Sequence, residues 1–452
     1  MRRTLQFAAL CVALCISGMG LARAETFNTA DFRTKAVEAL AAGDAHAALA
    51  MADALLTRDP QDFDAHLLRA RAARELGQNA DALSASETAW SLADTDLERH
   101  AAALVRAQAL SSSDRRTAAQ LWLRRAVQYA PDPAARARAI RDFRYVRARN
   151  PLSVDLRFGL APRSNINNGS VHSSARLFDL PFEFQLSGAA QALSGFETSA
   201  GASLRYRISE APTHATDLRF SLDSRSYTLS KEARALAPAA RGSDYGQINL
   251  TAGFLHRWSD PTGRREWLVG ADIGRLWYGG APYADVARLT GGLNLALPNS
   301  QRLSIALTEE RNRGPLAPSS DVSRVALGWS AALPSGPMLS LSATFADSTS
   351  ATSSADYRDL SLGLDIAPRR PFFGAEATFS LDLRGRDYPA NPFAAGPRND
   401  REVAASLSLA LPKAEYLGFK PVLTLSARKN RSNVAIYETR DIGLSLGFRS
   451  AF

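Results

Sequence analysis

The sequence predicts an α + β chain with two folded domains: a tetratricopeptide-like α-solenoid over residues 25–149 and a 14-stranded antiparallel transmembrane β-barrel over residues 150–452. Three observations lead to this prediction. The first 24 residues have the pattern of an export signal. The next segment has a helical period and repeats itself every 34 residues. The remainder alternates apolar and polar residues, as strands with two different faces do.

Residues 1–24 have the three parts of a secretory signal peptide. Arg2 and Arg3 give a positive start, residues 5–19 form an apolar core, and Ala22-Arg23-Ala24 provides a small-x-small cleavage site. An N-terminal membrane anchor is the alternative, but the apolar core is short for a helix that must cross a bilayer. The chain is therefore expected to be exported. Beyond this segment no apolar run approaches the ~18 residues of a transmembrane helix.

The composition excludes several chemistries. The only cysteines, Cys11 and Cys15, lie in the predicted signal, so the mature chain is expected to have no disulfide, thiolate metal site or cysteine nucleophile. The six histidines form no metal-binding pair, and no phosphate-binding or nucleophile motif is present. The net charge of +9 is spread through the chain and includes no basic run of the kind that binds nucleic acid. We therefore predict no enzyme activity, no cofactor and no nucleic-acid partner.

Residues 25–149 show an internal repeat of the tetratricopeptide length. Gly43 and Gly77 are 34 residues apart, as are Ala48 and Ala82, and a third copy is offset by three further residues. The glycines are expected in the turns between helices, the alanines where helices approach closely, and the prolines where the second helix of a pair ends. The residues predicted to pack the repeat are Gly43, Ala48, Pro60, Gly77, Ala82, Ala119 and Pro131. The alternative is an ordinary alanine-rich helical bundle.

Charge is unevenly distributed within this domain. Residues 25–98 hold 6 basic and 14 acidic residues, whereas residues 99–149 hold 12 basic and 3 acidic residues. Because a solenoid arranges its repeats in sequence along its length, one end is expected to be acidic and the other basic. The charges either form solvated helix faces or dock the basic end on lipid headgroups, on the next domain or on an acidic segment of a substrate.

After Pro151 the period changes from that of a helix to that of a strand. Alternation recurs in an even number of segments, which is the rule for single-chain bacterial barrels. The 14 predicted strands lie within residues 152–160, 196–208, 218–222, 248–254, 267–278, 289–297, 303–307, 325–333, 339–345, 360–366, 375–383, 403–411, 420–428 and 440–452. Short turns, as at residues 260–263, alternate with longer polar links, as at residues 230–243, which are expected on the periplasmic and external sides respectively.

One face of the strands carries Arg, Asp and Ser, which requires water on that face, and either a barrel lumen or a soluble β-sandwich could supply it. Three features favour the closed barrel: the export signal, the long and evenly spaced strands, and the aromatic residues near strand ends. Tryptophan and tyrosine residues lie near strand ends, where a membrane interface favours amphipathic rings. These aromatic residues are Tyr245, Trp258, Trp277, Tyr278, Tyr357, Tyr388, Tyr416 and Tyr437.

The last strand, residues 440–452, resembles the closing strand of bacterial outer-membrane barrels, because it alternates and ends on an aromatic residue. An edge strand of a soluble protein is the alternative. The pattern also resembles the signal that barrel assembly machinery recognises. The residues that fit this signal are Asp441, Gly443, Leu446, Phe448 and Phe452. This strand is expected to pair with residues 152–160 and close the barrel.

Residues 159–169, Gly-Leu-Ala-Pro-Arg-Ser-Asn-Ile-Asn-Asn-Gly, resemble a stretch of the surface lipoprotein assembly modifier (Slam) family, in which the first barrel strand runs into an Asn-Ile-Asn segment. Asn165 and Asn167 carry this resemblance, although both residues also suit a turn. The layout of the mature chain is similar to that family as well. The resemblance implies an outer-membrane translocon with a periplasmic repeat domain. Such a protein delivers a lipoprotein or another exported protein to the cell surface or the medium.

Two other functions fit the same layout. The first is an exopolysaccharide export porin with a tetratricopeptide scaffold. Proteins similar to that kind carry longer repeat arrays than the roughly three copies of this chain. The second is a passive porin. The partners expected from the translocon reading are an exported protein or surface lipoprotein, outer-membrane lipids and the barrel assembly machinery.

Overall fold

The computed structural model describes residues 28–334 and 336–452. It divides into two compact units, one that ends at Val146 and one from Arg147 to Phe452, so the division falls within the helix α8 (Pro133–Arg149). The predicted signal peptide lies outside the described residues. Among the helices of the described part, none combines the length and the apolarity needed to cross a membrane.

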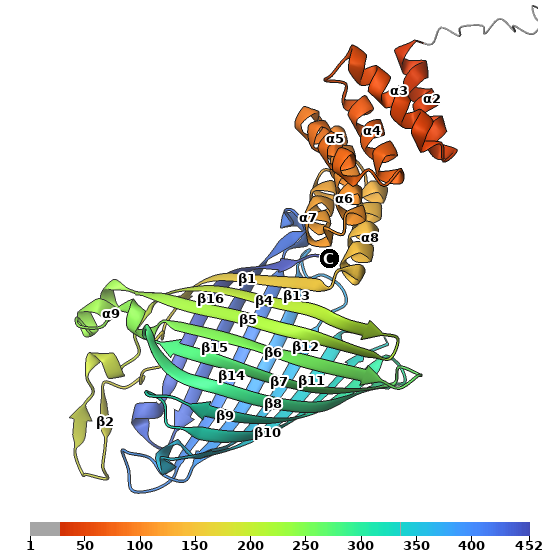
Figure 1. Ribbon diagram of the computed structural model, residues 1–452. Helices are drawn as coiled ribbons and strands as arrows, with labels where there is room; N and C mark the ends of the chain where they lie inside the picture. Colours follow the sequence, from red (N-terminus) through yellow and green to blue (C-terminus); the bar gives the residue numbers. More distant parts are fainter. Residues whose placement is uncertain (1–27, 335) are drawn as a thin grey trace, which may run out of the picture. The chain divides into compact units, whose positions relative to one another are not determined.

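The first unit is built of helices that follow one another in pairs (Figure 1). Short turns connect the two helices of each pair, as expected for tetratricopeptide-like repeats. The helices described in this unit are α2 (Thr29–Ala41), α3 (Ala45–Arg58), α4 (Phe63–Glu75), α5 (Asn79–Leu92), α6 (Asp96–Ser112), α7 (Arg116–Gln128) and α8. The predicted helical domain is thus confirmed.

Polar side chains fix where these helices begin. The side chains of Asp44 and Asp62 accept hydrogen bonds from the backbone N–H groups three residues later, both at 3.0 Å. At the start of α6, Thr95 and Glu98 exchange such bonds in a capping box. These bonds pair N–H groups that a helix start otherwise leaves without a partner.

In each helix pair, a residue in the left-handed backbone conformation follows the end of the first helix. Gly43 (φ +82°) and Gly77 (φ +74°) occupy this position in the first two repeats. In the third repeat the position is taken by Asp114, with φ +57°. Aspartate tolerates this conformation better than most residues, which explains why the third repeat lacks the glycine that marks the other two.

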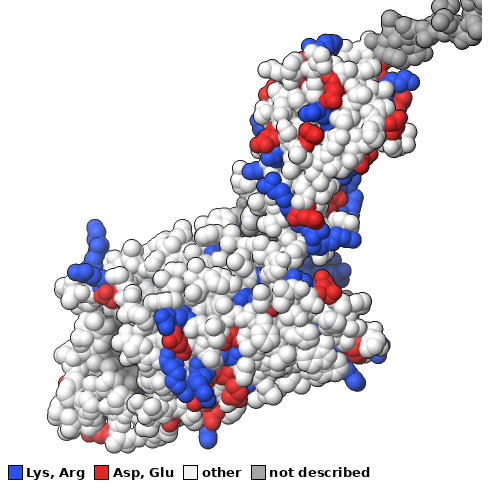
Figure 2. Space-filling model, viewed as in Figure 1, with Lys and Arg blue, Asp and Glu red and all other residues white. Residues whose placement is uncertain are grey.

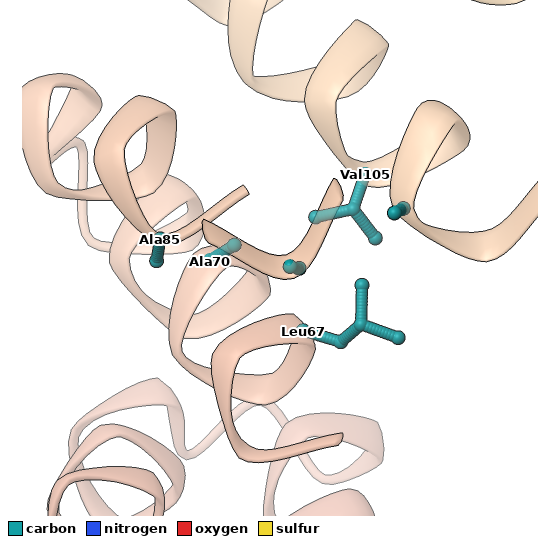
Figure 3. Close-up of a cluster of buried hydrophobic side chains, with 6 residues drawn as sticks. Leu67, Ala70, Ala85 and Val105 are labelled. Carbon is teal, nitrogen blue, oxygen red and sulfur yellow. The ribbon is translucent and has the colours of Figure 1, made fainter. Parts of the chain in front are cut away.

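Alanine dominates the core of this unit. Ala48, Ala82 and Ala119 are fully buried, and Pro60 and Pro131 lie between helices. A buried cluster joins Leu67 and Ala70 of α4, Ala85 and Ala89 of α5, and Ala102 and Val105 of α6 (Figure 3). Because an alanine side chain is a single methyl group, the helices can approach closely at these positions.

The second unit is a closed antiparallel barrel of 14 strands, as predicted. Each strand pairs with its neighbours in the sequence, and β1 and β16 meet where the barrel closes. Its strands are β1 (Leu152–Arg163), β4 (Gly195–Ala211), β5 (His214–Leu229), β6 (Gln247–Ser259), β7 (Arg265–Tyr278), β8 (Ala281–Leu297), β9 (Gln301–Arg313), β10 (Ser320–Ala332), β11 (Met338–Ser350), β12 (Tyr357–Ala367), β13 (Glu376–Tyr388), β14 (Arg398–Ala410), β15 (Phe419–Ser432) and β16 (Thr439–Ser450).

The outer wall of the barrel is apolar. In β1, for example, Val154, Leu156, Phe158 and Leu160 point outward and are 44 to 57% exposed. Figure 2 shows a wall largely free of charged residues, with one group of both signs near the end where α9 (Lys231–Leu236) and β2 (Ser174–Arg176) lie. Exposed apolar side chains on every strand suit contact with lipid.

The two ends of the barrel differ. The turns at residues 260–264, 298–300 and 333–337 lie at one end, which we call the turn end. The other end, the loop end, carries α9 and the hairpin of β2 with β3 (Glu183–Gln185). One connection at the loop end departs from the predicted alternation of short and long links, because Gly279 and Gly280 join β7 to β8 in a two-residue turn.

Candidate functional site at the closing seam

The junction between β1 and β16, which we call the seam, is the least paired junction of the barrel. Three residue pairs connect the two strands: Gly159 with Gly447, Leu160 with Leu446, and Arg163 with Gly443. Every other junction between described strands of the barrel has between 9 and 16 pairs. The sequence predicted the partners, but pairing was expected along residues 152–160, and it is confined to the part of β1 nearest the loop end.

Local sequence explains part of this weakness. The Ser164 N–H donates to the Ile442 carbonyl at 3.2 Å. Because alternate residues of a strand face the same neighbour, Pro162 is the next residue of β1 to face β16, and proline has no N–H to donate. Glycines at three of the six paired positions also leave the seam without side-chain packing there.

Asp441 joins β16 to the end of β1. Its carboxylate accepts hydrogen bonds from the Ser164 hydroxyl and the Asn165 backbone N–H, both at 3.2 Å. The Arg163 guanidinium also pairs with it at 3.3 Å. The residue that the sequence singled out as part of an assembly signal therefore also ties the two closing strands together.

Asn165 and Asn167 fold the segment that follows β1. Asn165, which is buried, forms two hydrogen bonds of 2.9 Å with the backbone of Gly169. The Asn167 side chain donates to the Gln191 carbonyl at 2.8 Å and accepts from the Leu193 N–H at 2.9 Å. The two asparagines thus hold together the start and the end of residues 164–194, which we call the cap loop.

Gly169 has a packing role in this arrangement. A Cβ atom built on Gly169 would lie 2.3 Å from the Gln191 carbonyl oxygen, so a larger residue would force the two segments of the cap loop apart. Only the glycine allows the backbones to approach this closely.

The cap loop contacts loops on both sides of the seam at the loop end. On the β16 side, the Val171 N–H donates to the Glu438 carbonyl at 2.9 Å, and the Phe178 N–H donates to the Phe393 carbonyl at 2.6 Å. On the β4 side, Leu193 is fully buried against Ala233 of α9. These contacts fasten the loop end of the seam from outside the strands.

A pocket of about 570 Å³ lies inside the barrel at the loop end of the seam. Its wall is formed by strands on both sides of the seam, and it is strongly charged. The charged residues that line it are Arg163, Arg225, Arg384, Arg386, Arg398 and Arg428, with Glu197, Asp400, Glu402 and Asp441.

Aromatic rings hold some of these arginines. The Arg398 guanidinium lies between the rings of Tyr388 and Tyr437, at 3.5 and 3.8 Å from their centroids, and such cation–π contacts fix its position. Arg384 and Arg386 share the carboxylate of Asp359. A wall of paired charges can line the path of a polar chain. Within the described residues no group of three His, Cys, Asp or Glu could hold a metal ion.

The other predicted signal residues lie on the same strand or beyond it. A Cβ atom on Gly443 would meet the Arg163 guanidinium at 2.8 Å. Leu446 and Phe448 point outward and are exposed, and Phe452 follows the end of β16. Recognition of these residues by assembly machinery stays a prediction.

The helical unit has a second candidate site that sequence reasoning missed. Trp90 of α5 contacts Trp122 of α7 edge to face, with 4.8 Å between ring centroids. The guanidiniums of Arg106 and Arg125 lie 4.7 and 4.2 Å from the Trp122 ring. In the sequence, this aromatic–arginine cluster is indicated only by Trp90 and Trp122, two of the six tryptophans of the chain. Arginine and aromatic side chains are both frequent at protein-binding surfaces.

Asp62 is the most deeply buried acid of this unit. Its carboxylate accepts a 2.6 Å bond from Arg33 as well as the capping bond from Ala65. Burial raises the pKa of Asp62, but the hydrogen bonds from Arg33 and Ala65 outweigh it, so the pKa lies below the ordinary value of 3.8. The ion pair connects α2 to the start of α4.

Residues 261–452 match the family model of the surface lipoprotein assembly modifier, so the resemblance to this family is confirmed for the C-terminal part of the barrel. Residues 159–169, which carried the resemblance in the sequence, lie outside the matched part. No curated protein sequence matches the chain. Together with the closed barrel and its apolar wall, the family match supports an outer-membrane protein that acts in translocation or assembly.

Solved structures resemble each unit only distantly. The first TPR domain of human RPAP3 is 18% identical over 26% of this chain and 91% of its own, with a TM-score of 0.24. A bacterial polysaccharide outer membrane secretin is 6% identical over 66% of this chain and 98% of its own, with a TM-score of 0.34. Acinetobacter baumannii OccAB3 is 9% identical over the same shares, also with a TM-score of 0.34. Similarity of this degree says nothing about what the chain transports.

Proposed function

We propose that this chain is an outer-membrane translocon that receives an exported protein or lipoprotein on its repeat domain and delivers it across the outer membrane. The observation that carries the proposal is the seam, a weakly paired junction beside a charged luminal pocket. Its β16 side lies within the residues that match the surface lipoprotein assembly modifier family. A passive porin has no need for a weak junction between its first and last strands.

The proposal places the repeat domain in the periplasm. Short turns of outer-membrane barrels lie on that side, and the chain enters β1 at the turn end. The aromatic–arginine cluster around Trp122 supplies the receiving surface, because it offers aromatic faces and positive charge to an acidic or apolar segment of the exported protein.

Deletion of residues 25–149 behind an intact signal peptide tests the receiving role. The barrel is expected to remain in the outer membrane and to migrate differently when heated and unheated, whereas surface display of the co-expressed substrate is lost. Surface labelling of intact cells measures display. Unchanged display would contradict the receiving role.

A finer test uses the cluster alone. Trp122→Ala is expected to reduce display severalfold, because the ring holds both arginines. Trp277→Ala is a matched control, since Trp277 belongs to the barrel strand β7 and lies outside the repeat domain. If the wild-type chain and both variants export a polysaccharide and display no protein, the chain is an exopolysaccharide export porin, which is the alternative function.

A further inference from the structure

One strand edge of the barrel has no partner. Residues 152–158 of β1 pair with β4 along their whole length, from Leu152 with Tyr206 to Phe158 with Ala200. On their other side the described strands provide no residue pair, because the pairing with β16 stops at Gly159. The two ends of this stretch have other contacts: the Leu152 N–H donates to the Asn150 side-chain oxygen at 3.2 Å, and the Phe158 carbonyl oxygen faces Gly447 of β16. The register would place Phe158 opposite Phe448 and Leu156 opposite Ser450, yet neither pair forms.

An unpaired edge is unfavourable at this location. Backbone N–H and C=O groups that face lipid find no water to pair with, and each unpaired group costs several kcal/mol. A free edge in a sheet also accepts an added strand from another chain. The seven residues span about 23 Å at the usual rise per residue, which nearly matches the ~25 Å apolar band of such barrels. One extended segment would therefore reach along this edge and pair with the groups between Leu152 and Phe158 that have no partner strand.

The side chains of this edge define the partner. Leu152, Val154 and Leu156 alternate with Ser153, Asp155 and Arg157. The apolar residues lie on the lipid side, where Val154 and Leu156 are exposed, and the polar ones on the luminal side. An added strand meets lipid on one face and water on the other, so it must alternate apolar and polar residues as β1 does.

We propose that the free edge of β1 binds an extended, alternating segment of the exported polypeptide, which enters the seam from the turn end while the cap loop keeps the loop end closed. This inference rests on the proposed translocation function. The asymmetry of the seam supports it, since the three residue pairs, the contacts of Asp441 and the cap loop all lie toward the loop end.

Two cysteine pairs test the two ends of the seam separately, in a mature chain that is otherwise free of cysteine. Leu156→Cys with Ser450→Cys forms the turn-end lock, and Leu160→Cys with Leu446→Cys forms the loop-end lock. All four positions lie on the lipid side of their strands. Leu160 and Leu446 are paired, and paired antiparallel residues approach closely enough for a disulfide. The turn-end lock forms when β16 comes against the free edge of β1 in the same register. Oxidation in cells is followed on a non-reducing gel, and substrate display by surface labelling.

The turn-end lock is expected to reduce display at least tenfold and to be reversed by reduction, whereas the loop-end lock leaves display unchanged. Full display with the turn-end lock closed would overturn the inference, and so would equal loss with both locks. If the reduced variants and the wild-type chain also fail to display substrate, the translocation proposal itself fails.

A photo-crosslinking residue at Val154 provides a second measurement that needs no disulfide. Crosslinks to the exported protein are expected at Val154 and not at Leu218, which is also exposed to lipid but lies on the fully paired strand β5. A crosslinked band at twice the mass of the chain would mean that a second copy covers the edge, and lipid adducts alone would mean that no segment binds. Either result would overturn the inference.

Discussion

Replacement of Asp441 by alanine separates two roles of this residue. Sequence reasoning places Asp441 in an assembly signal, whereas its contacts tie β16 to the end of β1 and the start of the cap loop. If the contacts matter, the Asp441→Ala variant is expected to assemble into the membrane but to open its cap loop more often.

The expected magnitude follows from the three contacts that are lost. The hydrogen bonds from Ser164 and Asn165 are 3.2 Å long and the closest approach of Arg163 is 3.3 Å. Distances at the long end of the usual range suggest about 0.5–1 kcal/mol each, or about 1.5–3 kcal/mol together. Since 1.4 kcal/mol is a factor of ten, the open population rises roughly 10- to 100-fold.

Limited proteolysis of intact cells measures this population, because cleavage follows the open form when opening is fast. The cap loop offers Phe178 and Phe182 to chymotrypsin. Asp441→Ala is expected to speed cleavage there by roughly the same factor, and Asp382→Ala, which removes a luminal carboxylate from β13, is the matched control. A cleavage rate within twofold of wild type would refute the assignment of Asp441 as a tie across the seam.

Three further predictions address stability and assembly. Because the pKa of Asp62 is lowered in the folded state, its contribution to stability is complete at neutral pH and is lost as the pH falls below 3.8. The helical signal in circular dichroism is therefore expected to fall in this acid range, and Asp62→Asn should remove this pH dependence. Gly77→Ala should destabilise the repeat domain by about 1 kcal/mol in urea unfolding, since a Cβ has open space but the positive φ is strained, whereas Asp114→Gly should be neutral or stabilising. Phe448→Ala should lower the amount of barrel in the outer membrane, and Leu444→Ala, equally exposed on the same face of β16, should lower it less; equal effects would argue against a specific signal at Phe448.

The sequence alone determined the architecture. The 34-residue interval and the change of period at Pro151 predicted the two kinds of domain, and the count of alternating segments predicted 14 strands. These features could be predicted because they depend on local periodicity, which each segment expresses without reference to any distant one. The offset third repeat was also visible, although the left-handed residue there, Asp114, is recognised only in the structure.

The extent of pairing at the seam could be decided only by tertiary structure. Closure brings β1 and β16 together from opposite ends of the barrel sequence, and their register depends on the tilt and stagger of all the intervening strands. For the same reason no sequence pattern showed that Asp441 would meet Ser164, or that Asn167 would hold Leu193. The strand chosen from sequence as the one that closes the barrel does so, but over less than half of its partner. A closed sheet must fit its last strand to an edge whose position every other strand has set.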